Sequence, residues 1–244
     1  MRRFGLIGRP LGHSASAAYF AAKFAREGIG DALYELYELP AVGELPRLLA
    51  DHPDLAGFNV TIPYKQAVIP YLDDLAFEAR NIGAVNCVGR SGDRLTGYNT
   101  DLEGLRASFA GLLGDGVPER ALVLGTGGAS QAVQYALAEL GVEYALVSRD
   151  PMKGDFTYDT LPPEEVAERL LIVNASPVGT YPAVDEAPRI PYAFVTPRHR
   201  VLDLVYNPAQ TLFLAYAEQR GARTMNGETM FRAQAEASWR IWNA

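Results

Sequence analysis

The sequence predicts an α/β protein built from two α/β domains. Short apolar runs alternate with amphipathic segments along the whole chain, which is typical of strand–helix–strand units that form a parallel sheet. A glycine-rich stretch at residues 111–118 separates an expected helix from a new strand. Because 244 residues are enough for two small domains, we expect one domain from residues 1–101, joined by a last helix at 226–244, and another from residues 102–225.

Apolar runs bounded by glycine, proline or polar residues mark the expected strands. They are residues 4–7, 33–39, 55–60, 85–88 and 94–97 in the first domain, and 121–124, 144–147, 170–173 and 201–204 in the second. The runs 85–88 and 94–97 are joined by a tight turn at Ser91-Gly92, which predicts a hairpin.

Amphipathic segments mark the expected helices. They are residues 16–26, 42–50, 102–112, 129–140, 211–220 and 229–239. Gly28 and Gly30 end the first of these helices, and Pro63 predicts the start of a further helix after the strand at 55–60.

The composition excludes several classes of protein. Lys and Arg total 22 against 29 Asp and Glu, a net charge of -7, whereas proteins that bind the nucleic-acid backbone carry excess positive charge. The single cysteine, Cys87, cannot form an internal disulfide, and His13, His52 and His199 are too widely spaced for a metal site. No stretch approaches the roughly 18 consecutive apolar residues of a membrane span, and the start lacks a secretion-signal core. We expect a cytoplasmic protein with no metal, nucleic-acid or membrane partner.

A glycine turn follows the strand expected at 121–124. Its sequence, Gly125-Thr-Gly-Gly-Ala-Ser130, leads into the helix expected at 129–140. Glycines let the backbone approach a pyrophosphate closely, and the amides at a helix start hold the anion. The pattern departs from the full Gly-x-Gly-x-x-Gly fingerprint, so it indicates either a dinucleotide site or a tight connection.

The strand expected at 144–147 ends at Ser148-Arg149-Asp150, where a dinucleotide-binding domain recognises the ribose. An acidic residue about 20 positions after the first glycine favours the free 2′-hydroxyl of NAD, whereas an arginine suits the 2′-phosphate of NADP. Arg149, with Lys153 beside it, predicts NADP, and Asp150 leaves NAD as the alternative.

Polar side chains follow the expected strands of the first domain. Because ligands bind at the carboxyl ends of strands in open α/β sheets, these residues are candidates for a substrate site. A serine or aspartate before a helix is also an ordinary cap, and that alternative stays open for Ser14, Ser16 and Asp101. The clusters are Ser14 with Ser16, Asn59 with Thr61 and Lys65, and Asn86 with Asn99 and Asp101.

Two further residues have more than one interpretation. In the helix expected from Pro63, Lys65 would lie in the first turn, where the helix dipole depresses a lysine's pKa and suits it to carry a proton. The alternative is a solvated lysine. Gln234, on an otherwise apolar helix face, is either a buried structural amide or a ligand contact, and we expect Cys87 in the core.

Together these motifs resemble the shikimate dehydrogenase family over nearly the whole chain. The resemblance implies an N-terminal substrate-binding sheet and a C-terminal Rossmann-like dinucleotide-binding domain. Residues 151–158 lack a helical pattern where the family has a crossover helix, which predicts an abbreviated second crossover. The motifs are Gly8-Arg-Pro-Leu-Gly-His-Ser14-Ala-Ser16, Asn59-Val-Thr-Ile-Pro-Tyr-Lys65, Gly83-Ala-Val-Asn86, Asn99-Thr-Asp101, Gly125-Thr-Gly-Gly-Ala-Ser130 and Asn226-Gly-x-x-Met230-x-x-x-Gln234, with Asn174-Ala-Ser-Pro-x-Gly179 and Asp203-Leu-Val-Tyr206-Asn-Pro as further segments.

The resemblance implies roles for individual residues, with Lys65 and Asp101 as the catalytic pair. The implied substrate contacts are Ser14, Ser16, Asn59, Thr61, Lys65, Asn86, Asp101, Tyr206 and Gln234. The implied cofactor contacts are Gly125, Thr126, Gly127, Gly128, Ala129, Ser130, Ser148, Arg149, Lys153, Leu204, Gly227 and Met230.

The reaction implied by the resemblance is the NADPH-dependent reduction of 3-dehydroshikimate to shikimate, in the biosynthesis of chorismate and aromatic amino acids. Lys65 would exchange a proton with the reacting hydroxyl, and Asp101 would hold that hydroxyl and the ammonium in one geometry. The alternatives are a quinate/shikimate dehydrogenase that uses NAD and a catalytically silent ligand sensor. The presence of both Lys65 and Asp101 favours an enzyme. The sequence leaves open whether the chain is a monomer or a homodimer.

Overall fold

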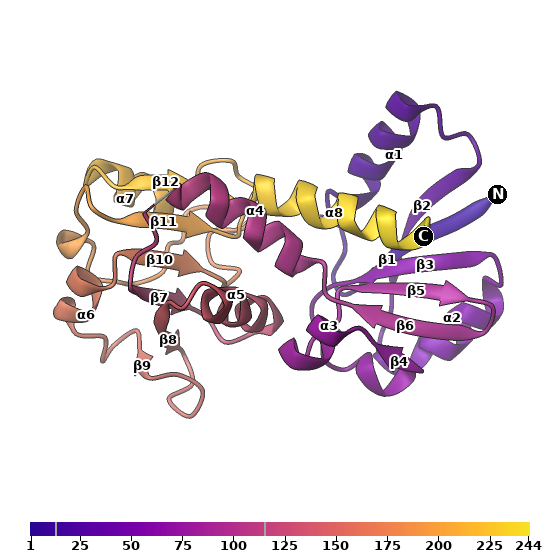
Figure 1. Cartoon of the computed structure of the whole chain (residues 1–244), viewed down its shortest axis with the longest axis horizontal. Coiled ribbons are helices and arrows are strands. Elements are labelled where there is room, and N and C mark those ends of the chain that lie inside the picture. Colours follow the sequence, from indigo (N-terminus) through magenta and orange to yellow (C-terminus); the bar gives the residue numbers. More distant parts are fainter. Residues whose placement is uncertain (13, 115) are drawn as a thin grey trace. The chain divides into compact units, whose positions relative to one another are not determined.

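The computed structural model describes residues 1–12, 14–114 and 116–244, so His13 of the first motif lies outside the described residues. The chain divides into two compact units (Figure 1). The first comprises Met1–Thr100 and Ala235–Ala244, and the second comprises Asp101–Gln234. Within the described residues each unit contains a six-stranded sheet with helices, which confirms the predicted α/β class.

The sheet of the first unit is mixed, with the strand order β2-β1-β3-β5-β6-β4. Its strand β5 runs antiparallel to both neighbours, while the other neighbouring strands are parallel. The carboxyl ends of β1, β3 and β6 therefore lie at the same edge as the amino end of β5. The strands are β1 (Arg2–Gly8), β2 (Ala32–Glu38), β3 (Leu55–Val60), β4 (Asp74–Leu75), β5 (Cys87–Ser91) and β6 (Arg94–Tyr98).

Helices cover both faces of this sheet. On one face, aromatic residues of α1 and of the last helix, α8, pack on Phe4 of β1, and the Trp242 ring stacks on Phe4 with centroids 4.8 Å apart. On the other face, Leu45 of α2 and Ala79 of α3 pack on Phe58 of β3. The helices are α1 (Ser16–Glu27), η1 (Val42–Glu44), α2 (Leu45–Asp51), η2 (Ile69–Tyr71), α3 (Phe77–Ile82) and α8 (Glu228–Trp242), of which Ala235–Trp242 belongs to this unit.

The helix expected to start at Pro63 is not formed. Residues 62–68 make turns instead, and the next helical turn is η2. The carbonyl of Lys65, which in a helix would accept from the N–H four residues later, accepts from the N–H of Val85 at 2.7 Å. The Val85 N–H, 20 residues along the chain, thus binds the carbonyl oxygen that a helix would need for its own hydrogen bond. The prediction that a helix dipole acts on Lys65 is therefore wrong.

Cys87 lies in the core of the first unit, as predicted, with no exposed surface. Burial raises the pKa of its thiol to about 12, and only a thiolate reacts rapidly with disulfide reagents. We expect the native protein not to react with dithionitrobenzoate at about pH 8, and the urea-unfolded chain to release one nitrothiobenzoate per thiol. The absorbance of the released group measures both. Rapid reaction of the folded protein would contradict the buried position.

The sheet of the second unit is parallel throughout, with the strand order β12-β11-β10-β7-β8-β9. Counted from β7, this is the order 3-2-1-4-5-6 of Rossmann folds, which confirms the predicted Rossmann-like domain. All six carboxyl ends point to one edge. The strands are β7 (Arg120–Leu124), β8 (Glu143–Ser148), β9 (Phe156–Thr157), β10 (Leu171–Asn174), β11 (Arg200–Asp203) and β12 (Arg223–Met225).

The core of this unit lies between the sheet and its helices. Val166 of α6 and Phe213 of α7 pack on Leu122 and Ile172 of the central strands. The helices are α4 (Asp101–Leu113), α5 (Gly128–Glu139), α6 (Pro163–Glu168), η3 (Tyr192–Phe194) and α7 (Leu212–Gln219), and the first part of α8 belongs here as well. In the described parts of the chain, no helix has the length and apolarity of a bilayer-spanning segment.

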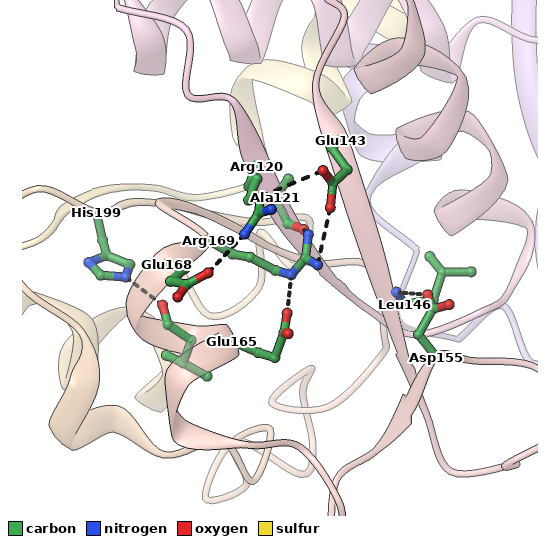
Figure 2. A network of polar contacts seen from close by, with 10 residues as sticks. Arg120, Ala121, Glu143, Leu146, Asp155, Glu165, Glu168, Arg169 and His199 are labelled. Carbon is green, nitrogen blue, oxygen red and sulfur yellow. Dashed lines mark hydrogen bonds and ion pairs between the residues drawn. The ribbon is translucent and has the colours of Figure 1, made fainter.

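The connection from β8 to β9, residues 149–155, contains no helix. The loop returns to the side of β8 within these residues, because Asp155 forms two hydrogen bonds with the backbone of Leu146. Its Oδ2 accepts from the Leu146 N–H at 2.8 Å (Figure 2). Its own N–H donates to the Leu146 carbonyl at 2.9 Å. The predicted abbreviation of the crossover is present, and β9 is reduced to two residues.

Ion pairs hold the amino-terminal edge of this sheet (Figure 2). The side chain of Arg169, 9% exposed, pairs with Glu165 of α6 at 2.7 Å and with Glu143 at the start of β8 at 3.4 Å. Arg120, at the start of β7, pairs with Glu168 of α6 at 2.8 Å. These contacts fasten α6 to the amino ends of the strands, at the edge opposite to the glycine turn.

Candidate active site

Six of the predicted substrate residues belong to the first unit, and the structure brings them to one edge of its sheet. Two follow β1, three lie at the end of β3 or in the turns after it, and one precedes β5. They are Ser14, Ser16, Asn59, Thr61, Lys65 and Asn86. The shared edge follows from the topology, because β5 starts where β1 and β3 end.

The side-chain amide of Asn59 forms three hydrogen bonds within the protein. Its Nδ2 donates to the Asn86 carbonyl at 3.1 Å and to Ser238 Oγ at 2.9 Å, and its Oδ1 accepts from the Tyr34 hydroxyl at 2.9 Å. Only 6% of the residue is exposed. Because both amide donors are used, what Asn59 has left to offer a substrate is the second lone pair of its carbonyl oxygen.

Asn86 continues this buried network to the end of β6. Its Nδ2 donates to Thr100 Oγ1 at 3.0 Å, and its Oδ1 accepts from the Thr100 N–H at 2.6 Å. The Thr100 hydroxyl in turn lies 3.1 Å from Ser238 Oγ. The network fixes the amide planes at this edge, so that they need little reorganisation when a ligand binds.

Three members of this network were not predicted as site residues: Tyr34, Thr100 and Ser238. Thr100 lies inside the Asn99-Thr-Asp101 motif, which was a usable signal, and Ser238 follows Gln234 by one helical turn. Tyr34 lies on an expected strand and gave no signal. Burial raises the pKa of its hydroxyl well above its ordinary range, so it remains a donor to Asn59.

The serines of the first motif lie at the start of α1. Ser14 Oγ accepts from the Ser16 N–H at 3.2 Å, and α1 begins at Ser16. This bond satisfies one of the amide groups that a helix start leaves unpaired. The N-cap residue of α1 is Ala15, so neither serine occupies the cap position of the alternative interpretation, although Ser14 binds an amide of the helix start. Both serines, like Thr61 and Lys65, are half-buried.

The glycine turn after β7 has the geometry of an anion cradle. Gly125 has a φ of 108°, a region that favours glycine, and a Cβ there would lie 3.2 Å from the backbone of Ala175. Gly127 is extended and precedes α5, and a Cβ there would meet nothing within 4 Å. A turn that is tight at one glycine and open at the next, followed by a 12-residue helix, fits a pyrophosphate.

The other residues of this motif form the first turn of α5. Gly128 and Ala129 are half-buried, and Ser130 is fully buried. Ser130 Oγ accepts from Gln134 Nε2 at 3.2 Å. The side chain of Ser130 therefore serves the helix, while the predicted contribution of this turn to a cofactor site comes from backbone amides.

Ser148, at the end of β8, joins the glycine turn to the following loop. Its hydroxyl lies 3.2 Å from Thr126 Oγ1 and accepts from the Asp150 N–H at 3.1 Å. The residue is 4% exposed. The contact sets the distance between the two loops that are predicted to hold the phosphates and the ribose.

The loop after Ser148 separates the roles of Arg149 and Asp150. The Asp150 carboxylate closes the loop, since its Oδ1 accepts from the Met152 N–H at 3.0 Å and its Oδ2 lies 3.5 Å from Lys153 Nζ. Arg149 is exposed. The Asp150 carboxylate, which left NAD as an alternative in the sequence, is thus paired within its own loop with Met152 and Lys153, whereas Arg149 is exposed.

Asp203, at the end of β11, is fully buried. It accepts from the Thr211 hydroxyl at 2.6 Å, from Asn174 Nδ2 at 2.9 Å and from the Val205 N–H at 3.0 Å. Burial raises the pKa of its carboxyl to about 6 even though these three donors favour the charged form. The cluster joins the carboxyl ends of β10 and β11.

Leu204, Gly227 and Met230 lie where α8 meets the sheet of this unit. A Cβ on Gly227 would overlap the carbonyl of Leu204, and the Gly227 N–H donates to the Val205 carbonyl at 3.0 Å. Met230 is 8% exposed and packs against Gly104 of α4. Only a glycine can therefore stand at position 227 next to Leu204. The side chain of Met230 is mostly buried against α4, so little of it is left to contact a cofactor.

The remaining predicted substrate residues belong to this second unit. Tyr206 stacks on Phe231, with ring centroids 4.7 Å apart, and Gln234 Nε2 donates to the Phe231 carbonyl at 3.0 Å. Asp101 is the first residue of α4 and 5% exposed. It lies inside the helix rather than before it, where its charge interacts favourably with the helix dipole.

No group of three or more potential metal ligands occurs in the described ranges of the chain. Comparison with known proteins gives the same family as the motifs. Residues 6–88 match the model of the shikimate dehydrogenase substrate binding domain. A shikimate dehydrogenase (NADP(+)) of Thermus thermophilus is 38% identical to the chain, over 99% of this chain and 92% of that protein.

The chain belongs to the shikimate dehydrogenase family. The crystal structure of a shikimate 5-dehydrogenase from Thermus thermophilus in complex with NADP(H) and shikimate has a TM-score of 0.86 and 35% identity, over 99% of this chain and 93% of that chain. That of the Listeria monocytogenes enzyme in complex with shikimate and NAD has a TM-score of 0.84 and 29% identity, over 100% and 92%. The family expected from the motifs is confirmed, and its two-sheet architecture is present here.

Proposed function

We propose that this member of the shikimate dehydrogenase family reduces 3-dehydroshikimate to shikimate with NADPH, a step towards chorismate and the aromatic amino acids, in the cytoplasm. The observation that carries the proposal is the full-length similarity to the Thermus thermophilus structure that contains NADP(H) and shikimate. The two sheets support it, because one presents amides, hydroxyls and a lysine at a single edge and the other has Rossmann strand order.

The substrate is a polyhydroxylated ring carboxylate, and we propose that it is held by the residues that the family resemblance implies. Hydroxyls and amides suit its ring hydroxyls, because both donate and accept hydrogen bonds. The proposed contacts are Ser14, Ser16, Asn59, Thr61, Lys65, Asn86, Asp101, Tyr206 and Gln234. The fixed amide planes of Asn59 and Asn86 support specific recognition of hydroxyl positions.

Lys65 and Asp101 are proposed as the catalytic pair. In the direction of reduction, negative charge develops on the carbonyl oxygen, and the Lys65 ammonium donates a proton to that oxygen. In oxidation the lysine amine takes the hydroxyl proton back. Asp101 accepts from the hydroxyl or the ammonium and keeps the two in one geometry. Proton transfer by a positioned group of this kind is worth about 10²- to 10⁴-fold in rate.

The second unit fits a dinucleotide. When bound, the nicotinamide supplies or accepts the hydride. The amides of Gly125, Thr126, Gly127, Gly128, Ala129 and Ser130 are proposed to hold the pyrophosphate, Ser148, Arg149 and Lys153 the adenosine end, and Leu204, Gly227 and Met230 the nicotinamide end. The wide turn at Gly127 supports the first assignment, because a Cβ there would meet no other atom within 4 Å.

Arg149→Ala is expected to raise the KM for NADP about tenfold or more and to leave the KM for NAD nearly unchanged. The reason is that the exposed guanidinium can pair with the 2′-phosphate, a group that NAD lacks, while Asp150 is engaged by Met152 and Lys153. Initial rates against each cofactor measure the ratio. Arg198→Ala, at an exposed arginine of another loop of the same unit, is the control. An unchanged ratio would remove Arg149 from the phosphate site.

The test of the proposed function is the initial rate of nicotinamide reduction with shikimate and quinate, each paired with NADP and NAD. We expect turnover of shikimate with NADP. The complex of the Listeria monocytogenes enzyme with NAD makes an NAD-dependent shikimate or quinate dehydrogenase the second candidate, and activity in those pairings would favour it. Binding of shikimate without turnover in any pairing would identify a ligand sensor.

A further inference from the structure

Asn99 is a buried polar residue that the proposed reaction leaves without a role. It follows β6 and is 7% exposed. Its Nδ2 donates to the Ala84 carbonyl at 2.9 Å, whereas its Oδ1 is buried and has no hydrogen-bond partner in the part of the chain that the structure describes. A buried acceptor without a donor reduces stability. The reason for an asparagine at this position is therefore to be found in what its donor does.

The bond from Asn99 reaches Lys65 through a single peptide group. The peptide between Ala84 and Val85 accepts from Asn99 Nδ2 at its carbonyl and donates to the Lys65 carbonyl, at 2.7 Å, through its N–H. Ala84 and Val85 are both completely buried. Water therefore does not compete for either bond, and the peptide transmits the position of one residue to the other.

Lys65 needs such a support because its backbone lies in turns. In a helix, repeated bonds of the backbone would fix its position, but residues 62–68 have no such repeat. The bond from Val85 ties the Lys65 carbonyl to the segment between α3 and β5. That segment is in turn tied to Asn99, which follows β6, and β6 lies on the far side of β5 from β3, the strand that precedes Lys65.

We propose that Asn99 is a positioning residue that sets the place of Lys65 through the Ala84–Val85 peptide. The inference rests on the proposed function, in which Lys65 exchanges a proton with the substrate. Proton transfer requires hydrogen-bond reach, and a shift of about 1 Å costs about 10²-fold in rate. Loss of the Asn99 donor thus reduces turnover more than substrate binding.

The first test is Asn99→Leu, which removes the donor and the unpaired oxygen at similar volume. We expect kcat for shikimate oxidation to fall about tenfold and the KM for shikimate to stay within about threefold. In the Lys65→Ala background the same change is expected to lower kcat by less than about twofold, because the group that it positions is gone. An equal fall in both backgrounds would overturn the proposal.

Two further variants guard against a trivial loss of structure. Asn81→Leu makes the same change at an exposed position of α3 and is expected to keep kcat within about twofold of the parent. Asn99→Met likewise has no group that can donate to the Ala84 carbonyl, so it is expected to lower kcat as Asn99→Leu does. Circular dichroism establishes that each variant is folded. A folded Asn99→Leu with unchanged kcat would overturn the proposal.

A second measurement does not depend on activity. The chain has three lysines, Lys23, Lys65 and Lys153, so competitive labelling with acetic anhydride and mass spectrometry follows each amine separately. Asn99→Leu is expected to change the pH dependence of Lys65 labelling relative to exposed Lys153. If the parent protein does not oxidise shikimate, the proposed function fails. The inference about Asn99 fails separately, if the labelling of Lys65 is the same in both proteins.

Discussion

Replacing Lys65 with alanine is expected to lower kcat for shikimate oxidation about 10²-fold or more, while the KM for shikimate changes only modestly. The amine is the proposed proton carrier, and without it water must take the hydroxyl proton. Other proposed substrate contacts of the first unit, such as Asn59 and Asn86, are held in place by hydrogen bonds to Ser238 and Thr100 that the substitution does not touch. Steady-state rates with saturating NADP measure both constants.

Lys65→Arg is the matched variant for this experiment. Arginine keeps the positive charge but does not give up its proton near neutral pH. If Lys65 acts through proton transfer, the arginine variant loses kcat as the alanine variant does. A Lys65→Arg protein with near-parental kcat, or an alanine variant in which only the KM rises, would show that the residue acts by charge or binding alone.

Asp203 is expected to make the protein less stable as the pH rises from about 4 to about 6. Its pKa is 3.8 in an unfolded chain and about 6 in the folded protein. Between these values the folded state binds more protons than the unfolded state, so the free energy of unfolding decreases with pH, in total by about 3 kcal/mol. Below pH 4 and above pH 6 this group adds no further dependence.

Asp203→Asn removes this titration. We expect the free energy of unfolding of the variant, relative to the parent, to increase by about 3 kcal/mol between about pH 4 and pH 7. Urea unfolding followed by circular dichroism, together with hydrogen exchange of the β10 and β11 peptides, measures the difference in this unit. Asp159→Asn, at an exposed aspartate, is the control. A difference that does not vary with pH would contradict the raised pKa.

The sequence was most informative where local chemistry decides the structure. The strand, glycine turn and helix around Gly125 are all specified within a few residues, and α5 begins within one residue of its expected start. The wrong helix at Pro63 shows the limit of such signals, since the Lys65 carbonyl found a partner at Val85, far along the chain. The strands β4, β9 and β12 have two or three residues, too few for any periodicity.

In the site, too, features set by the local sequence were predicted and features set by distant residues were not. The motifs placed Asn59 and Asn86 at strand ends and Lys65 shortly after a strand, because the end of an apolar run is visible in sequence. Their partners were not predictable, since the bond from Asn59 to Ser238 joins residues 179 positions apart and only the fold brings them together. The closed loop at Asp150 likewise depends on hydrogen-bond geometry that composition does not reveal.

The connection between β8 and β9, which contains no helix, is a segment that can be exchanged on its own. Residues 149–155 begin at the Ser148–Asp150 contact and end at the double pairing of Asp155 with Leu146, so both ends are anchored to β8 by the loop's own bonds. Nothing of the sheet has to be rebuilt when the residues between these anchors are replaced. The proposed cofactor contacts Arg149 and Lys153 can therefore be exchanged here as a short peptide, whereas a helical crossover would have to be exchanged together with its packing.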